Sequence, residues 1–169
     1  MRKLETISNI AVICTALLFS YVLVTKFVMS PPPSQSTIPH PAEGKHLSLA
    51  GVDWSANKRT LVMAMSSHCG FCVRSTPFYQ KLGSSADLKS KRVGLIAVLP
   101  DDPATNSSFL DHYKVKVDQV INSQLASINV EATPTLLLVN SKGVVEREWI
   151  GMLDSTAESQ VRSQLFNGR

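Results

Sequence analysis

Two cysteines, Cys69 and Cys72, lie three positions apart at the junction between two kinds of sequence. Residues 60–65 before them form a short apolar run of strand length, and residues 70–82 have the length and composition of a helix. Unpaired backbone N–H groups and the helix dipole stabilise a thiolate at a helix start. We therefore predict that Cys69 is the attacking sulfur, with a lowered pKa. Cys72, one turn further into the helix and shielded, is then the resolving sulfur.

Two other uses of the cysteine pair compete with redox exchange. A structural zinc ion usually takes four protein ligands. The other candidate ligands show neither a second CxxC nor an HxxxH spacing: Cys14, His40, His46, His68 and His112. A purely structural disulfide would close so short a loop that it constrains little of the unfolded chain. The sequence favours a redox-active pair without a metal or another cofactor, and the two alternatives stay open.

The apolar runs at residues 60–65 and 92–99 flank the helix-like segment, which predicts a βαβ unit whose sheet is covered on both faces. Later in the chain, two strand patterns flank a turn that contains Gly143. In chain order we expect a helix at 103–113, a strand at 114–121, a short helix at 123–128, strands at 135–139 and 144–150, and a final helix from a cap at Asp154 or Ser155 through Leu165. The predicted fold class is α/β.

Taken together, these features resemble the thioredoxin superfamily, and specifically its membrane-anchored extracytoplasmic branch of the TlpA/ResA type. The resemblance covers residues 47–165 and rests on a combination of motifs: the strand before the cysteines, Cys69-Gly70-Phe71-Cys72, Pro77, and Glu131-Ala132-Thr133-Pro134-Thr135 before a strand and hairpin. Residues 47–54 also resemble the segment that this branch adds ahead of the first long strand. The resemblance implies a thioredoxin-like fold, in which helices flank a central mixed β-sheet.

The resemblance also implies roles for two of the prolines. Thr133-Pro134 is similar to the family's cis-proline dipeptide, which packs beside the disulfide and offers backbone groups to an extended substrate. Thr133 would then contact Cys69 and tune its redox potential. Pro77 is similar to the proline that kinks the family's active-site helix, and a helix that ends near Thr76 is the alternative.

Three residues depart from the family's pattern. Met63 stands where thioredoxins carry a buried acid, and no carboxylate in the strand replaces it. His68 replaces an aromatic residue, and it either stabilises the Cys69 thiolate as a cation or is a solvated loop residue. Phe71 replaces the proline of the CGPC form, so the family's reducing potential does not carry over. We predict that His68, Gly70 and Phe71 bind substrate or tune the site.

Residues 7–25 form a run of 19 residues without a charge, preceded by Arg2 and Lys3 and closed by Lys26. At about 1.5 Å per residue the run is about 28 Å long as a helix, close to the hydrocarbon thickness of a bilayer. We expect residues 1–29 to be an uncleaved signal anchor with a cytoplasmic N-terminus. A cleaved signal peptide is the main alternative, and a buried helix of a soluble protein is the other.

Residues 30–44 hold five of the nine prolines and no apolar run that could pack, which predicts an extended linker. The folded domain is expected at residues 45–169. Cys14 lies in the predicted membrane segment, where a small apolar thiol fits without a special role. Intermolecular pairing or acylation of Cys14 is the alternative.

The formal net charge of +4 gives no reason to expect nucleic-acid binding. The sequence instead predicts a single-pass protein of the inner (cytoplasmic) membrane whose catalytic domain faces the periplasm or the cell exterior. Its substrates would be protein thiols and disulfides. By the resemblance, it receives electrons from a transmembrane reductase of the DsbD/CcdA kind and acts as a reductant. An oxidase or isomerase of the same fold, or a non-catalytic CxxC metal-binding or assembly module, is the alternative.

Overall fold

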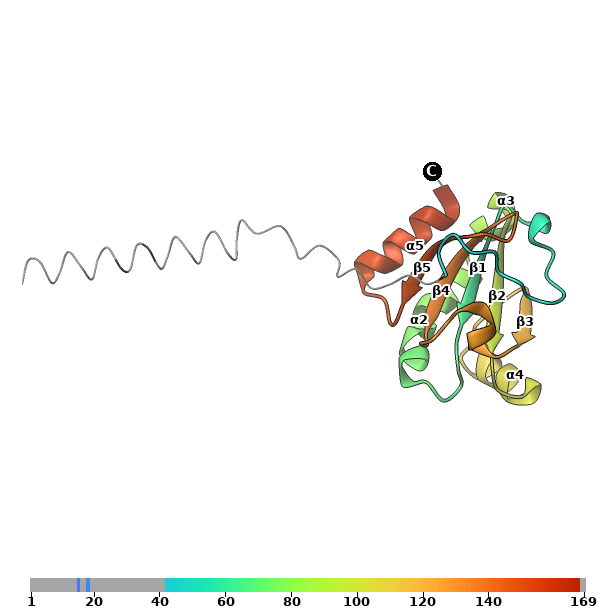
Figure 1. Cartoon of the computed structure of the whole chain (residues 1–169). Coiled ribbons are helices and arrows are strands. Elements are labelled where there is room, and N and C mark those ends of the chain that lie inside the picture. The colour runs from blue at the N-terminus through green and yellow to red at the C-terminus, as the bar shows by residue number, and fades with distance from the viewer. Residues whose placement is uncertain (1–14, 16–17, 19–41, 168–169) are drawn as a thin grey trace, which may run out of the picture. The chain divides into compact units, whose positions relative to one another are not determined.

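The computed structural model describes residues 42–167 together with Thr15 and Leu18. Residues 42–167 belong to one compact unit, His40–Arg169. In this part of the chain, strands form a five-stranded sheet in the order β3-β2-β1-β4-β5 (Figure 1). β2 pairs with β1 and β3 in parallel, whereas β4 pairs with β1 and β5 antiparallel. The bounds are β1 Arg59–Ala64, β2 Val93–Leu99, β3 Gln119–Asn122, β4 Thr135–Asn140 and β5 Val145–Ile150.

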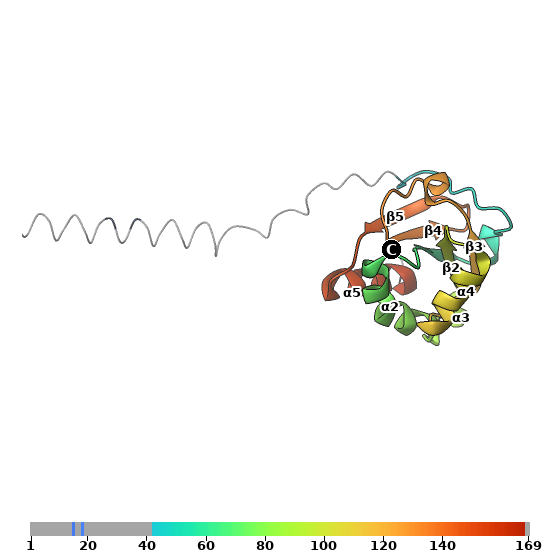
Figure 2. The same cartoon turned by 90° about the horizontal axis from the view of Figure 1, so that it is seen from below.

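The α-helices of the described unit cover one face of the sheet (Figure 2). They are α2 (Gly70–Gly83), α3 (Asp87–Lys91), α4 (Pro103–His112) and α5 (Ser155–Asn167). The β1-α2-β2 and β2-α4-β3 connections step along the sheet in the same direction, and right-handed crossovers of this kind place their helices on the same face. Residues 42–54 and the 3-10 turn η3 (Leu125–Ile128) cover the opposite face.

An apolar core lies on each face of the sheet. Along β1, Leu61 and Met63 face the helices, whereas Val62 and Ala64 face the opposite cover. All four side chains are fully buried. The expected covering of both faces is confirmed, and it explains why residues 61–64 of β1 are all apolar instead of alternating with polar residues.

The carboxyl ends of β1 and β2 lie at the same edge of the sheet, because these two strands are parallel neighbours. Met65 continues their pairing one residue beyond β1, since its N–H donates to the Val98 carbonyl oxygen at 3.0 Å. The chain then leaves the sheet twice at this edge, as residues 66–69 leading into α2 and as residues 100–102 leading into α4. The topology therefore places the CxxC loop beside the segment that follows β2.

The strand predicted at residues 114–121 is wrong over its first half, because β3 begins only at Gln119. Lys114 has a φ of 52°, and the Val115 N–H donates to the Leu110 carbonyl oxygen at 2.9 Å. These residues form the turn that ends α4. The short helix predicted at 123–128 is confirmed in place, as the 3-10 turn η3.

Two short elements do not appear among the predicted ones, the 3-10 turn η2 (Trp54–Ala56) and α3. The sequence of α3, DLKSK, is only five residues long and has no apolar periodicity to reveal it. At the other end of the chain, α5 starts as expected. The Ala157 N–H donates to the Asp154 carboxylate at 2.8 Å, so Asp154 is the cap.

Helix α2 continues through Pro77 to Gly83, so the alternative in which it ends near Thr76 is wrong. Proline has no N–H to donate to the carbonyl four residues earlier, here that of Val73. The Thr76 hydroxyl donates to this carbonyl instead, at 2.8 Å. The second half of the helix is held in the core by three buried side chains, Phe78, Tyr79 and Leu82.

Within the described residues, no helix is both long enough and apolar enough to cross a membrane. The predicted anchor, apart from Thr15 and Leu18, lies outside those residues, and so does Cys14. The same holds for residues 30–41 of the predicted linker. The anchor, the linker and the cellular location therefore stay predictions.

Candidate active site

Cys69 and Cys72 lie at the amino end of α2. Cys69 is the N-cap residue, and its sulfur accepts a hydrogen bond from the Cys72 backbone N–H at 3.3 Å. The Cys69 thiol also donates to the Thr133 carbonyl oxygen at 3.3 Å. Both cysteines are free thiols. When Cys69 loses its proton, the sulfur keeps the backbone donor that favours its charged form.

The two thiols differ in burial and in acidity. Cys69 is partly exposed, whereas Cys72 is completely buried. Burial raises the pKa of Cys72 to about 12. Burial also raises the pKa of Cys69, but hydrogen bonding from the Thr133 side chain and from Cys72 outweighs this, and the pKa of Cys69 lies below its ordinary value. At neutral pH Cys69 is therefore the more reactive sulfur of the pair.

The Thr133–Pro134 peptide bond is cis, as the resemblance implies. It lies just before β4 and brings the Thr133 carbonyl to the Cys69 sulfur across 64 residues of sequence. The Pro134 carbonyl oxygen accepts from the Gly151 N–H at 2.7 Å, which ties this loop to the segment after β5. Contacts with Cys69 and with Gly151 thus hold this loop next to the Cys69 sulfur.

Phe71 and Gly70, between the two cysteines, face open space. The Phe71 side chain is 53% exposed, and the guanidinium carbon of Arg74 lies 4.5 Å from the centre of its ring. A Cβ added at Gly70 would meet no atom within 4 Å. Met152, which follows the Gly151 whose N–H donates to Pro134, is also exposed. An incoming chain would meet an aromatic ring beside the cysteines and a backbone unhindered by side chains at Gly70.

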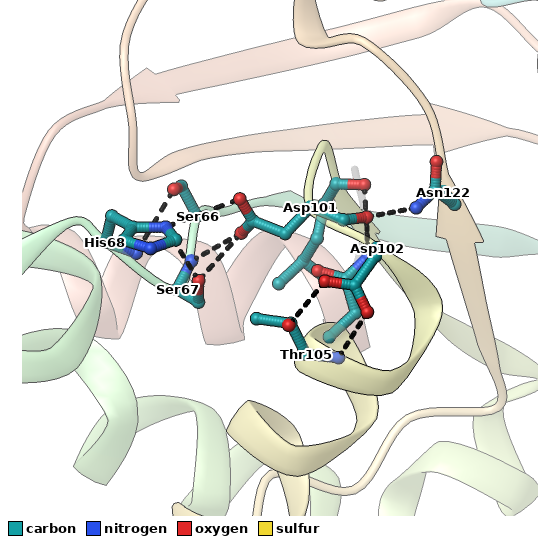
Figure 3. A network of polar contacts seen from close by, with 9 residues as sticks. Ser66, Ser67, His68, Asp101, Asp102, Thr105 and Asn122 are labelled. Carbon is teal, nitrogen blue, oxygen red and sulfur yellow. Dashed lines mark hydrogen bonds and ion pairs between the residues drawn. The ribbon is translucent and has the colours of Figure 1, made fainter.

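His68 has a defined partner, although its side chain is 79% exposed. Its Nδ1 atom lies 3.4 Å from a carboxylate oxygen of Asp101 and 3.0 Å from the Ser67 hydroxyl (Figure 3). The His68 side chain is solvated, as one of the two alternatives from the sequence has it, and it also contacts a carboxylate. Stabilisation of the Cys69 thiolate by His68 stays a prediction. His68 immediately precedes Cys69 in the chain, and its imidazole lies beside the Asp101 carboxylate.

Asp101 and Ser67 were not among the residues predicted from the sequence. The Asp101 carboxylate accepts hydrogen bonds from the Ser67 N–H at 3.0 Å and from the Ser67 hydroxyl at 2.8 Å. Burial raises the pKa of Asp101, but the bonds from Ser67 and the attraction of His68 outweigh it, and this pKa lies below its usual value. The signal available in the sequence was an acid two residues after the end of the strand that neighbours the CxxC strand.

Met63 lies fully buried in β1, in the same core cluster as Cys72 and Tyr79. The apolar side chain at this position therefore leaves the buried thiol without the acid that thioredoxins carry there. Burial raises the pKa of Tyr79 as well. In the described part of the chain, no group of three or more His, Cys, Asp or Glu side chains could hold a metal ion.

No protein-family profile matches the sequence, and no curated protein matches it. Solved structures match the fold. The thioredoxin domain of a thiol-disulfide oxidoreductase from Bacteroides vulgatus has a TM-score of 0.58 at 19% identity, over 75% of this chain and 99% of that domain. A thiol:disulfide interchange protein DsbE from Chlorobium tepidum has a TM-score of 0.54 at 20% identity, over 68% and 82%. StoA from Bacillus subtilis has a TM-score of 0.52 at 21% identity, over 63% and 81%. The fold is thioredoxin-like.

Proposed function

We propose that this protein is a thiol-disulfide oxidoreductase whose reacting groups are Cys69 and Cys72. The observation that carries the proposal is the asymmetry of the pair. One thiol is accessible, sits at a helix N-cap and has a lowered pKa, whereas the other is buried with a pKa of about 12. A structural disulfide or a metal site has no need of this difference, but exchange through a mixed disulfide does.

In the reducing direction, the Cys69 thiolate attacks one sulfur of a substrate disulfide, and the other substrate sulfur leaves as a thiolate that takes up a proton. A mixed disulfide between Cys69 and the substrate results. Cys72 then loses its proton and attacks the Cys69 sulfur, which releases the second substrate sulfur as a thiolate. The substrate gains two electrons and two protons, and the protein is left with a Cys69–Cys72 disulfide.

The surroundings of Cys69 support a protein or peptide as the substrate. An extended chain can lie over Gly70 and beside the cis Thr133–Pro134 loop, with an apolar side chain against the exposed Phe71 ring. We further propose that the protein acts as a membrane-tethered reductant of the TlpA/ResA type, facing the periplasm or cell exterior. A membrane reductase of the DsbD/CcdA kind would return electrons to the Cys69–Cys72 disulfide. A fold neighbour is named as a thiol:disulfide interchange protein, which supports thiol-disulfide exchange as the chemistry.

Reduction of insulin by dithiothreitol tests the activity. We expect the full chain in detergent to accelerate insulin precipitation, Cys69→Ser to reduce the rate to that of dithiothreitol alone, and Cys14→Ser to keep the wild-type rate. Stoichiometric metal in protein purified without chelator, together with no exchange, would instead support a metal-binding module. Equilibration with glutathione gives the direction, since a potential far below about −200 mV indicates a reductant and one near about −120 mV an oxidant.

The substrate is best identified by trapping. In Cys72→Ser the mixed disulfide at Cys69 cannot be resolved, so partner proteins should accumulate as reducible adducts in cells. A Cys69→Ser/Cys72→Ser chain is the control. A failure to recover any adduct that depends on Cys69 would contradict the mechanism.

A further inference from the structure

The polar contacts in front of the CxxC motif converge on one carboxylate. Residues 66–68 carry the chain from β1 to the N-cap of α2, and Asp101 reaches this loop from the end of β2 (Figure 3). One carboxylate oxygen of Asp101 accepts both the Ser67 N–H and the Ser67 hydroxyl, and the other lies 3.4 Å from His68 Nδ1. A single side chain therefore holds the loop backbone and the imidazole that precedes Cys69.

Asp101 is itself held in place by its backbone. Its carbonyl oxygen accepts a hydrogen bond from the Asn106 side-chain amide at 2.8 Å and another from the Asn122 amide. Asn106 is fully buried in α4, and Asn122 is the last residue of β3. Because α4 and β3 fix the Asp101 backbone, its carboxylate is presented to the loop in a set position. Its exposed fraction of 18% contrasts with 79% for His68.

The neighbouring charges do not compete for His68. Asp102 uses its carboxylate as the N-cap of α4, where it accepts from the N–H groups of Ala104 and Thr105. On α2, the guanidinium of Arg74 lies over the Phe71 ring. Among the described residues, the charged group that contacts the imidazole is therefore Asp101 from the end of β2, and Cys69 follows His68 directly in the chain.

We propose that Asp101 is a positioning residue for thiol exchange, which acts on Cys69 through His68. The carboxylate orients the imidazole through its Nδ1 atom, and a positive charge on this ring, in the residue next to Cys69, stabilises the thiolate. This proposal rests on the proposed function, since it concerns the reactivity of the same sulfur. The effect through His68 lowers the free energy of the Cys69 thiolate. The charge of Asp101 on its own would raise it, because an anion near Cys69 disfavours a second anion.

The opposite signs make the proposal testable. In Asp101→Asn the imidazole loses its anion. If Asp101 acts through His68, the Cys69 thiolate becomes scarcer wherever the ring of the wild type is charged. If Asp101 acts only through its own charge, the thiolate becomes more abundant. Imidazole titrates between about pH 5 and pH 8, so an effect through His68 must fade above that range.

The experiment measures alkylation of Cys69 by iodoacetamide from pH 5 to pH 9, on the full reduced chain in detergent. Mass spectrometry of the Cys69 peptide separates this thiol from Cys14. Near pH 6.5 we expect Asp101→Asn to react about threefold more slowly than wild type, the size typical of an exposed charge pair, and to match it at pH 9. His68→Asn, which keeps an N–H donor without the charge, should slow the reaction similarly.

The double variant shows whether Asp101 acts on Cys69 through His68 or through its own charge. In the His68→Asn background, Asp101→Asn should cause no further slowing and should speed the reaction slightly, because only the repulsion is then removed. Asp111→Asn, which removes an exposed charge from the far end of α4, is the matched control and should leave the profile unchanged. Faster alkylation in the single Asp101→Asn variant, or equal slowing in both backgrounds, would overturn the proposal.

Two further measurements separate the proposed effect of Asp101 from misfolding of a variant and from failure of the proposed function. Thermal unfolding of each variant checks that the fold is kept, and Ser67→Ala, which removes the hydroxyl but keeps the backbone N–H bond to Asp101, should show a smaller slowing than Asp101→Asn. Alkylation needs no protein substrate. A wild type that fails to reduce insulin would therefore refute the proposed function while leaving the coupling of Asp101 to Cys69 measurable.

Discussion

Resolution of a mixed disulfide at Cys69 should depend steeply on pH, because the attacking group in that step is the buried Cys72 thiol. Burial is the largest cause that raises the pKa of Cys72 to about 12. A thiol with that pKa is ionised to only about one part in 100,000 at pH 7, and its thiolate fraction rises about tenfold per pH unit. Since Met63 supplies no internal base, we expect the resolution rate to rise about 1,000-fold between pH 6 and pH 9.

The neighbouring Cys69 thiol also contributes to the raised pKa of Cys72, and this contribution is lost once Cys69 is in a mixed disulfide. Burial remains in that state. The absolute rate at a given pH is then somewhat higher than the thiol pair alone suggests, but the slope of the pH profile is unchanged as long as the pKa of Cys72 lies above the measured range.

Ellman's reagent provides the assay. The reduced chain, carrying Cys14→Ser to remove the other thiol, releases one thionitrobenzoate when Cys69 attacks and a second when Cys72 resolves the adduct. Stopped-flow absorbance separates the two phases, because the first depends on reagent concentration and the second does not. The second phase should be missing in Cys72→Ser. The reasoning would be refuted if the rate of the second phase stopped rising at a pH below about 8. Such a plateau would show that another group removes the Cys72 proton.

Two further predictions concern helix α2. Thr76→Val removes the hydroxyl that satisfies the carbonyl left free by Pro77, and it should lower the free energy of unfolding by about 1 kcal/mol, measured by urea denaturation. The loss should shrink in a Pro77→Ala background, where a backbone N–H becomes available. Gly83→Ala would place a Cβ 2.4 Å from the Lys116 carbonyl oxygen and should destabilise by about 1–3 kcal/mol. Gly70→Ala, with no atom within 4 Å of its Cβ, should leave stability unchanged or raise it by up to about 1 kcal/mol; equal losses at both glycines would contradict the packing argument.

Sequence patterns were reliable where a strand contains an uninterrupted run of buried residues. The runs that became β1 and β2 are buried on both faces, so every residue in them carries the same signal. The same reasoning failed at residues 114–118. Their alternation of lysine and valine is typical of a strand, yet Val115 is buried as part of a turn and the pairing with β2 starts only at Gln119. Alternation of apolar and polar residues indicates only that every second side chain is buried. A packed turn can produce this pattern as well as a strand can.

Some features of the candidate site can likewise be predicted from neighbouring residues, whereas others depend on the tertiary structure. The position of Cys69 and Cys72 at a helix start follows from neighbouring residues, because a strand, a short loop and a helix are local patterns. The difference in acidity between the two thiols, the contact of Cys69 with Thr133 and the link from Asp101 to His68 are decided by tertiary structure. Parallel pairing of β1 with β2 brings Asp101 to Ser67, 34 residues away in the chain. Antiparallel pairing of β1 with β4 brings Thr133 to Cys69, 64 residues away. Periodicity along the chain contains no record of such contacts, since each of them depends on which strand lies beside which.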